Sequence, residues 1–113
     1  MKTINDYRAT VGSPPLVEWT AEESCVDGEA ASDAKSNTPH GAFGSCNEFA
    51  QDECPGWPGP PSQLIVACLK AMWDEGPGGG HYENMKNAQS TKAACGFYQT
   101  TDGSWWATQN FAP

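Results

Sequence analysis

Residues 62–82 read SQLIVACLKAMWDEGPGGGHY and contain the clearest structural signal in the chain. Apolar side chains recur at helical spacing in the first part, which predicts an amphipathic helix from Ser62 to Asp74. The residues on its apolar face are Leu64, Ile65, Cys68, Ala71 and Met72. The glycine-rich run 76–80 ends this helix. An acidic residue, Glu75, and a histidine, His81, therefore flank one tight connection.

Two shorter helices are expected earlier in the chain. A capping pattern at Thr3 and Asp6 predicts a helix that ends near Gly12, just before two prolines. Residues 20–23, TAEE, form a second capping box and predict a helix that continues to about Ser36.

The segment between the second helix and residue 62 is expected to be mostly irregular. Residues 37–45 form a loop that carries His40, and residues 47–52 fit a short strand. Residues 54–61, CPGWPGPP, contain four prolines and two glycines, and we expect no regular structure there.

The end of the chain has the pattern of a β-hairpin. Residues 93–99 and 104–111 are rich in aromatic residues and flank the turn sequence TDG at 101–103. Helices followed by a terminal hairpin predict an α+β fold, with helices packed on an antiparallel sheet.

Length and charge limit the function classes. The 113 residues suit a single domain, residues 1–113, with one hydrophobic core. Fourteen acidic and six basic residues give a net charge of -8, which disfavours nucleic acid and anionic membranes as partners. No stretch is apolar enough to suggest a membrane span.

Five cysteines in so short a chain indicate an oxidising compartment. At least one is left unpaired within the chain, and five choices of the free cysteine with three pairings of the other four give fifteen possible arrangements. The protein is therefore expected to be a monomer or a dimer linked through the odd cysteine. The first residues lack an apolar signal sequence, and the cysteine content favours a secreted protein whose signal peptide has been removed.

The two histidines of the chain each have an acidic neighbour. His40 precedes Glu48 by eight residues, and Glu75 precedes His81 by six. Imidazole and carboxylate are the side chains that bind divalent metals or move protons near neutral pH. The four residues could form one open site if the fold brings them together.

Short motifs occur in a defined order along the chain. They are residues 5–8 NDYR with 14–19 PPLVEW, His40, 46–50 CNEFA, 72–75 MWDE, 80–82 GHY, 94–97 ACGF and 109–111 QNF. In this order the chain resembles the CAP superfamily, which comprises the cysteine-rich secretory, antigen 5 and pathogenesis-related 1 proteins. It differs from most members in the short connection 76–80 and in residues 83–87, ENMKN, so it is similar to compact bacterial forms.

The resemblance implies a three-layer α-β-α sandwich with a small antiparallel sheet. It also implies a central cleft in which His40 and His81 bind a divalent metal, zinc or another cation. Glu48 and Glu75 would then act through water or orient the imidazoles. Two histidines are too few for a tight structural zinc site, so we expect weak, optional and pH-sensitive binding.

The favoured function is a secreted CAP-type domain that binds a cation and a small molecule or extracellular protein, without turnover. A metal-dependent, peptidase-like hydrolase is the first alternative, with Glu48 or Glu75 activating a water molecule. The chain lacks a His-Glu-x-x-His helix and a third strong ligand, which disfavours this alternative. A lipid or sterol carrier is the second alternative and rests on the resemblance alone.

Overall fold

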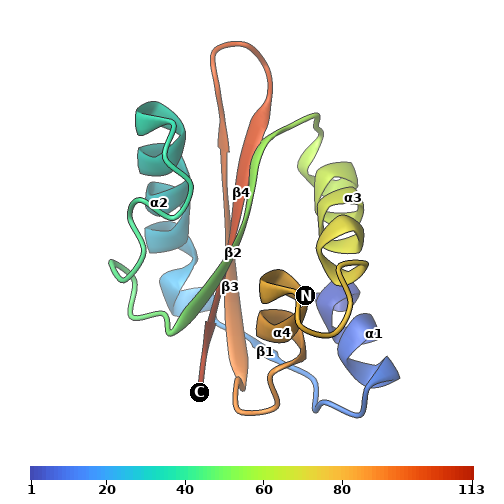
Figure 1. Ribbon diagram of the computed structural model, residues 1–113. Coiled ribbons are helices and arrows are strands. Elements are labelled where there is room, and N and C mark those ends of the chain that lie inside the picture. Colours follow the sequence, from blue (N-terminus) through green and yellow to red (C-terminus); the bar gives the residue numbers. More distant parts are fainter.

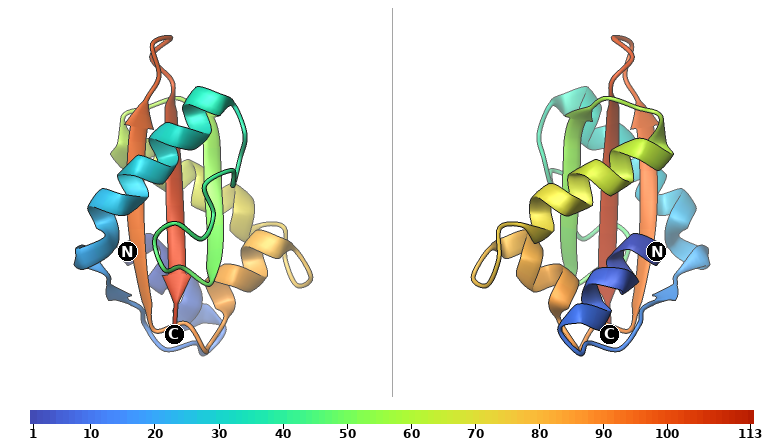
Figure 2. Two further views of the ribbon diagram at one scale, coloured as in Figure 1. Left: turned by 90° about the vertical axis from the view of Figure 1, so that its left-hand side faces the viewer. Right: turned by 90° about the vertical axis from the view of Figure 1, so that its right-hand side faces the viewer.

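The computed structural model describes residues 1–113 as helices on both faces of a four-stranded sheet (Figure 1). The elements are α1 (Lys2–Thr10), β1 (Val17–Glu18), the 3-10 turn η1 (Thr20–Glu22), α2 (Glu23–Ser36), β2 (Ala50–Trp57), α3 (Pro61–Trp73), α4 (Gly80–Lys86), β3 (Lys92–Gln99) and β4 (Trp105–Ala112). The strand order is β1-β3-β4-β2, with β2 at one edge. Helix α2 covers one face, and α1, α3 and α4 lie on the other side (Figure 2). The α+β prediction is confirmed.

Several predicted elements are present with nearly the predicted bounds. Helix α2 ends at Ser36, and α3 covers Pro61–Trp73. The hairpin of β3 and β4 pairs without interruption from Lys92↔Ala112 to Gln99↔Trp105. The predicted caps are wrong, because neither α1 nor α2 has a side-chain hydrogen bond at its start. The 3-10 turn η1 occupies most of the stretch where the second capping box was expected.

The prediction of no regular structure over residues 54–61 is wrong in its first half. Strand β2 continues through the sequence CPGW to Trp57. This is possible because β2 is an edge strand, where a proline without an N–H need not break a ladder. Its pairing with β4 changes register between Cys54 and Trp57, as at a β-bulge.

Two small elements were not predicted. Strand β1 pairs with β3 in parallel through Val17↔Lys92 and Glu18↔Ala93, so the sheet is mixed rather than purely antiparallel. Helix α4 has seven residues and is mostly polar, which is too short to show a helical hydrophobic period. Both elements depend on tertiary contacts that the local sequence does not reveal.

The two faces of the sheet are packed differently. The main apolar core lies on the side of α1, α3 and α4 and includes Ile4, Leu64, Leu69, Met85 and Phe111. The α2 side has only a small apolar cluster, Val26, Cys46 and Ala94. Much of the remaining space beneath α2 is filled by buried polar side chains, and these define the candidate site.

Two disulfides select one of the fifteen possible pairings. Cys25–Cys46 joins α2 to the loop that carries His40, and Cys54–Cys68 joins β2 to α3. Cys95 is free. Burial raises the pKa of its thiol to about 11, so it is poorly reactive at neutral pH. None of the helices has the length and apolar character needed to cross a membrane.

Candidate functional site

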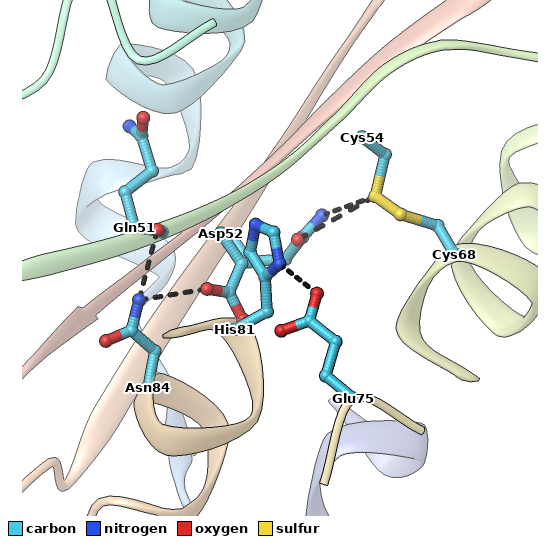
Figure 3. Close-up of polar contacts among 8 residues, drawn as sticks. Gln51, Asp52, Cys54, Cys68, Glu75, His81 and Asn84 are labelled. Atoms are coloured by element: carbon cyan, nitrogen blue, oxygen red, sulfur yellow. Dashed lines mark hydrogen bonds and ion pairs between the residues drawn. A yellow bond between two sulfur atoms is a disulfide. The ribbon is translucent and has the colours of Figure 1, made fainter. Parts of the chain in front are cut away.

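The edge strand β2 sends alternate side chains to opposite faces of the sheet. The Gln51 side chain contacts Glu29 of α2, whereas the Asp52 side chain contacts Asn84 of α4. Figure 3 shows the two side chains leaving the strand in opposite directions. Glu53 points to the α2 side again, because side chains alternate along a strand. All three residues are buried.

His81 lies in the first turn of α4 and contacts Glu75. Its Nδ1 is 2.6 Å from Glu75 Oε2, and each side chain is 35% exposed. Gly79 makes room for this pair, since a Cβ there would lie 2.7 Å from Glu75 Oε1. The predicted proximity of Glu75 and His81 is therefore present in the structure (Figure 3).

Asp52 is a fully buried carboxyl close to this pair. Its Oδ1 accepts a hydrogen bond from Asn84 Nδ2 at 3.0 Å, and its Oδ2 has no partner. Burial raises the pKa of Asp52 to about 7; the bond from Asn84 and the charge of His81 lower it, and Glu75 raises it. Asn84 also donates to the Gln51 main-chain oxygen at 3.2 Å, which fixes α4 against the edge of the sheet.

His40 lies on the α2 side of β2 in a left-handed backbone conformation, with φ of 61°. Its Nδ1 is 2.8 Å from Gln51 Oε1. Its main-chain N–H donates to Glu53 Oε1 at 2.7 Å. These two contacts hold both the backbone and the ring of His40 against β2.

The loop around His40 is held by buried carboxylates. Alternate N–H groups of the loop donate to them: His40 to Glu53, Ala42 to Asp33, and Gly44 and Cys46 to Glu48. The loop can follow this course because His40 adopts a left-handed backbone conformation and buried carboxylates accept its N–H groups. The sequence alone gave no reason to expect Asp33 or Glu53 beneath the loop.

Glu48 is connected to His40 through two amide side chains. Asn110 Nδ2 donates to Glu48 Oε2 at 3.1 Å and to Glu29 Oε1 at 2.5 Å. Asn110 Oδ1 accepts from Gln51 Nε2 at 2.9 Å, and Gln51 contacts His40. His40 and Glu48 thus belong to one hydrogen-bonded network, although they do not touch.

Two carboxyl pairs lie beneath α2, Glu29 with Glu48 and Asp33 with Glu53. Burial raises the pKa of Glu29 to about 7, the bond from Asn110 lowers it, and Glu48 raises it. Burial also raises the pKa of Glu53 to about 7, and Asp33 adds to the rise. The raised pKa values of Glu29 and Glu53 favour the protonated form of these two carboxyl groups up to about neutral pH. One oxygen of Glu29 and one of Asp33, Oε2 and Oδ2, are buried without a hydrogen-bond partner.

Two groups of three residues bring potential metal-ligating atoms within 4.8 Å of one another. They are Glu22, Cys25 and Cys46, and Glu29, Cys46 and Glu48. The cysteines in both groups are joined in the Cys25–Cys46 disulfide. They therefore offer no thiolate, which is the form of cysteine that binds metals. What remains in the second group is a carboxyl pair. Neither group contains a histidine.

The four predicted site residues therefore form two sets that meet at β2. Glu75 and His81 are in contact beside α4, while His40 and Glu48 are linked on the α2 side. The His40 ring contacts the Gln51 side chain, whereas the charges of His81 and Glu75 act on the carboxyl group of the next residue, Asp52. A single four-residue site stays a prediction.

The residues that connect these sets were missed by the sequence reasoning. They are Gln51, Asp52, Glu53, Asn84, Asn110, Glu29 and Asp33. A signal was present in the two paired strands, because QDE at 51–53 and TQN at 108–110 place polar runs in the middle of strands. Such runs are unusual for strands buried on both faces.

The comparisons with known proteins identify the family of this chain. Residues 1–111 match the sequence model of the CAP family, the cysteine-rich secretory protein family. Because the match covers nearly the whole chain, the protein belongs to the CAP family. No curated protein matches it.

A solved structure also has this fold. It is a cysteine-rich secretory protein from Staphylococcus aureus subsp. aureus Mu50, with a TM-score of 0.62 and 13% sequence identity. The similarity covers 99% of this chain but only 37% of that protein. At this identity, the similarity supports the fold alone.

Proposed function

We propose that this CAP domain is an extracellular binding domain that holds a divalent cation at the outer edge of β2, with His40 and His81 as its protein ligands. One observation carries the proposal. Both rings are hydrogen-bonded through Nδ1, His40 to Gln51 and His81 to Glu75, which leaves both Nε2 atoms available. Metal-binding histidines characteristically use one ring nitrogen for the metal and the other for such a bond.

The position of β2 supports one site rather than two. His40 contacts Gln51 on one face of the sheet, His81 acts electrostatically on Asp52 on the other face, and β2 has no neighbouring strand on its outer edge. Side chains from the two faces can therefore approach each other around this edge. A cation held there by two imidazoles would keep open positions for water or for a small ligand.

The surrounding charges also favour a cation. Glu75 orients His81. The unbonded oxygen of Asp52 is buried nearby, beneath α4. The chain carries a net charge of -8, which attracts cations over long range. The two disulfides and the CAP family are consistent with an extracellular location.

Calorimetric titration with zinc tests the proposal. The wild type should release or absorb heat with one-site stoichiometry, and the His40→Ala, His81→Ala double variant should show no such binding. Glu83→Ala is the matched control, because Glu83 is an exposed acidic residue on α4 that pairs with Lys86 rather than His81. Equal binding by the wild type and the double variant would refute the proposal.

A peptidase-like hydrolase remains the alternative with a metal. The contacts of Glu48 do not favour it as a base, because both its oxygens accept hydrogen bonds from N–H groups. Glu75 is engaged by His81. Chelator-sensitive cleavage of a peptide library by the wild type, absent from the double variant, would establish the hydrolase instead.

One observation favours the lipid or sterol alternative. A cavity of about 420 Å³ has an apolar wall that includes Ile65 and Phe97. Its other wall has three carboxyl groups, Glu18, Glu23 and Asp27, which would repel a fatty-acid head group. A neutral sterol fits this lining better than a fatty acid. Retention of a radiolabelled sterol by the purified protein would support this function, and no retention would remove it.

A further inference from the structure

We infer that Gln51 and Asn110 are positioning residues that hold neutral His40 as the Nδ1–H tautomer. The inference concerns the protein without metal. It deepens the proposed function, because it explains why Nε2 of His40 would be the free ligand. The tautomer itself does not depend on whether a cation binds.

The hydrogen bonds form an unbroken chain from His40 to two carboxyl groups. His40 Nδ1 is 2.8 Å from Gln51 Oε1, and Gln51 Nε2 is 2.9 Å from Asn110 Oδ1. Asn110 Nδ2 is 3.1 Å from Glu48 Oε2 and 2.5 Å from Glu29 Oε1. The three contacts that lead from His40 to Glu48, at 2.8, 2.9 and 3.1 Å, have ordinary hydrogen-bond lengths.

The direction of donation is set at the Glu48 end. Glu48 already accepts main-chain hydrogen bonds on both of its oxygens, from Gly44 on Oε1 and from Cys46 on Oε2, so Oε2 faces Asn110 as an acceptor. Asn110 must therefore present its amino group to Glu48. Its carbonyl oxygen then faces Gln51.

The orientation of Asn110 also fixes the direction of the next two hydrogen bonds, those of Gln51 and His40. Gln51 must present its amino group to the Asn110 oxygen, so its own carbonyl oxygen faces His40. That oxygen can only accept, and His40 must supply the proton from Nδ1. If the Gln51 amide were turned over, its oxygen would face the oxygen of Asn110. Its amino group would face His40, and Nδ1 would then have no acceptor.

Burial makes this polarity hard to reverse. Gln51, Asn110 and Glu48 have relative exposures of 5%, 0% and 7%, so bulk water cannot replace a mismatched bond. A buried donor or acceptor that is left without a partner is destabilising because its lost hydration is not replaced. In water, neutral imidazole favours the Nε2–H form, so the Nδ1–H form of His40 is imposed by its surroundings.

Nitrogen NMR of protein labelled with 15N-histidine tests the inference directly. The chain has two histidines, and a His81→Ala variant assigns the remaining signals to His40. In metal-free wild type, at a pH where the ring is neutral, we expect a protonated Nδ1 and an unprotonated Nε2. A protonated Nε2 would overturn the inference.

Two variants of nearly equal size test the role of Gln51. Gln51→Leu removes the acceptor, so His40 should shift toward the Nε2–H form and zinc affinity should fall about 10–100-fold. Gln51→Glu keeps the acceptor for His40 and, when its second oxygen is protonated, the donor for Asn110, so it should restore the Nδ1–H form. The His81 signals should be unchanged in both variants, because Glu75 orients that ring. An unchanged His40 tautomer in Gln51→Leu would refute the assigned role.

The outcomes for the two proposals can be separated. An Nδ1–H His40 in a protein that does not bind zinc would refute the proposed function and support this inference. If the metal-free protein has the Nε2–H form of His40 and the protein nevertheless binds zinc, the proposed function would be supported and this inference refuted. If Gln51→Leu does not fold, the tautomer of the wild type still decides.

Discussion

Gln51 and Asp52 are consecutive residues of β2 whose side chains point to opposite faces of the sheet. Gln51 contacts His40 on the α2 side, and Asp52 lies with Asn84 and His81 on the α4 side. This single step along an edge strand therefore connects the two histidine neighbourhoods. It also places buried carboxyl groups on both sides of the strand.

The stability of the fold should decrease as the pH rises from 5 to 8. The pKa values of Glu29, Asp52 and Glu53 are raised to about 7, each mainly by burial. Between their unfolded pKa values near 4 and this value, the folded state binds more protons than the unfolded state. The stabilisation is thus complete at acidic pH and is lost as the pH passes about 7.

Urea unfolding at pH 5 and pH 8 measures this effect. We expect the free energy of unfolding to be lower at pH 8 by at least about 1 kcal/mol, the value of one pKa unit being 1.36 kcal/mol. Asp52→Asn, which cannot ionise, should show a smaller difference between the two pH values. Equal stability of the wild type at both would show that these carboxyl groups are not held protonated.

Gly96 should not tolerate a methyl group. A Cβ there would lie 2.3 Å from the main-chain carbon of Val26, so α2 would have to move away from β3. Gly96→Ala should destabilise the protein by about 1–3 kcal/mol. Gly28→Ala is the control, because it lies in α2 with open space around it and should stabilise by up to about 1 kcal/mol. Thermal unfolding of both variants measures the contrast.

Gly79 should control the contact between Glu75 and His81. An added methyl group would lie 2.5 Å from Glu75 Cβ, so Gly79→Ala should displace the carboxylate and free the His81 ring. We expect weaker zinc binding and a change in the His81 tautomer by nitrogen NMR. Gly80→Ala adds the same group into open space and should leave both unchanged. Identical His81 signals in the two variants would contradict the assigned role of Glu75.

Arg8 should contribute strongly to stability. Its buried guanidinium donates to four main-chain oxygens, those of Pro14, Met85, Asn87 and Ser90, and so ties α1 to the end of α4. Arg8→Met should cost at least about 3 kcal/mol, because buried acceptors lose a charged donor. Lys2→Met, on the exposed face of α1, should change stability by less than about 0.5 kcal/mol. Chemical denaturation of both variants measures the contrast, and similar losses of stability in the two would contradict this assignment.

The parts of the fold with a strong local pattern could be predicted. Helix α3 has an apolar face, and the β3–β4 hairpin has a clear turn sequence, so both could be placed from their residues. Helix α4 and strand β1 could not, because each is short and depends on contacts distant in sequence. The continuation of β2 through Pro55 depends on its place at the edge of the sheet, which is a property of the whole topology.

The candidate site was predictable to a similar extent. Composition and motif order drew attention to His40, Glu48, Glu75 and His81, and the contact of Glu75 with His81 is present. The intervening residues escaped prediction because Gln51 and Asn110 have no chemistry of their own that marks them. Their role follows only from the register that pairs Gln51 with Asn110 across β2 and β4.

The central claim is that one divalent cation binds between His40 and His81 at the edge of β2. Anomalous diffraction from zinc-soaked crystals, measured on both sides of the zinc absorption edge, tests it most directly. We expect one peak about 2.0–2.1 Å from the Nε2 atoms of both histidines. No peak at either ring, or separate peaks that each contact one histidine, would contradict the claim.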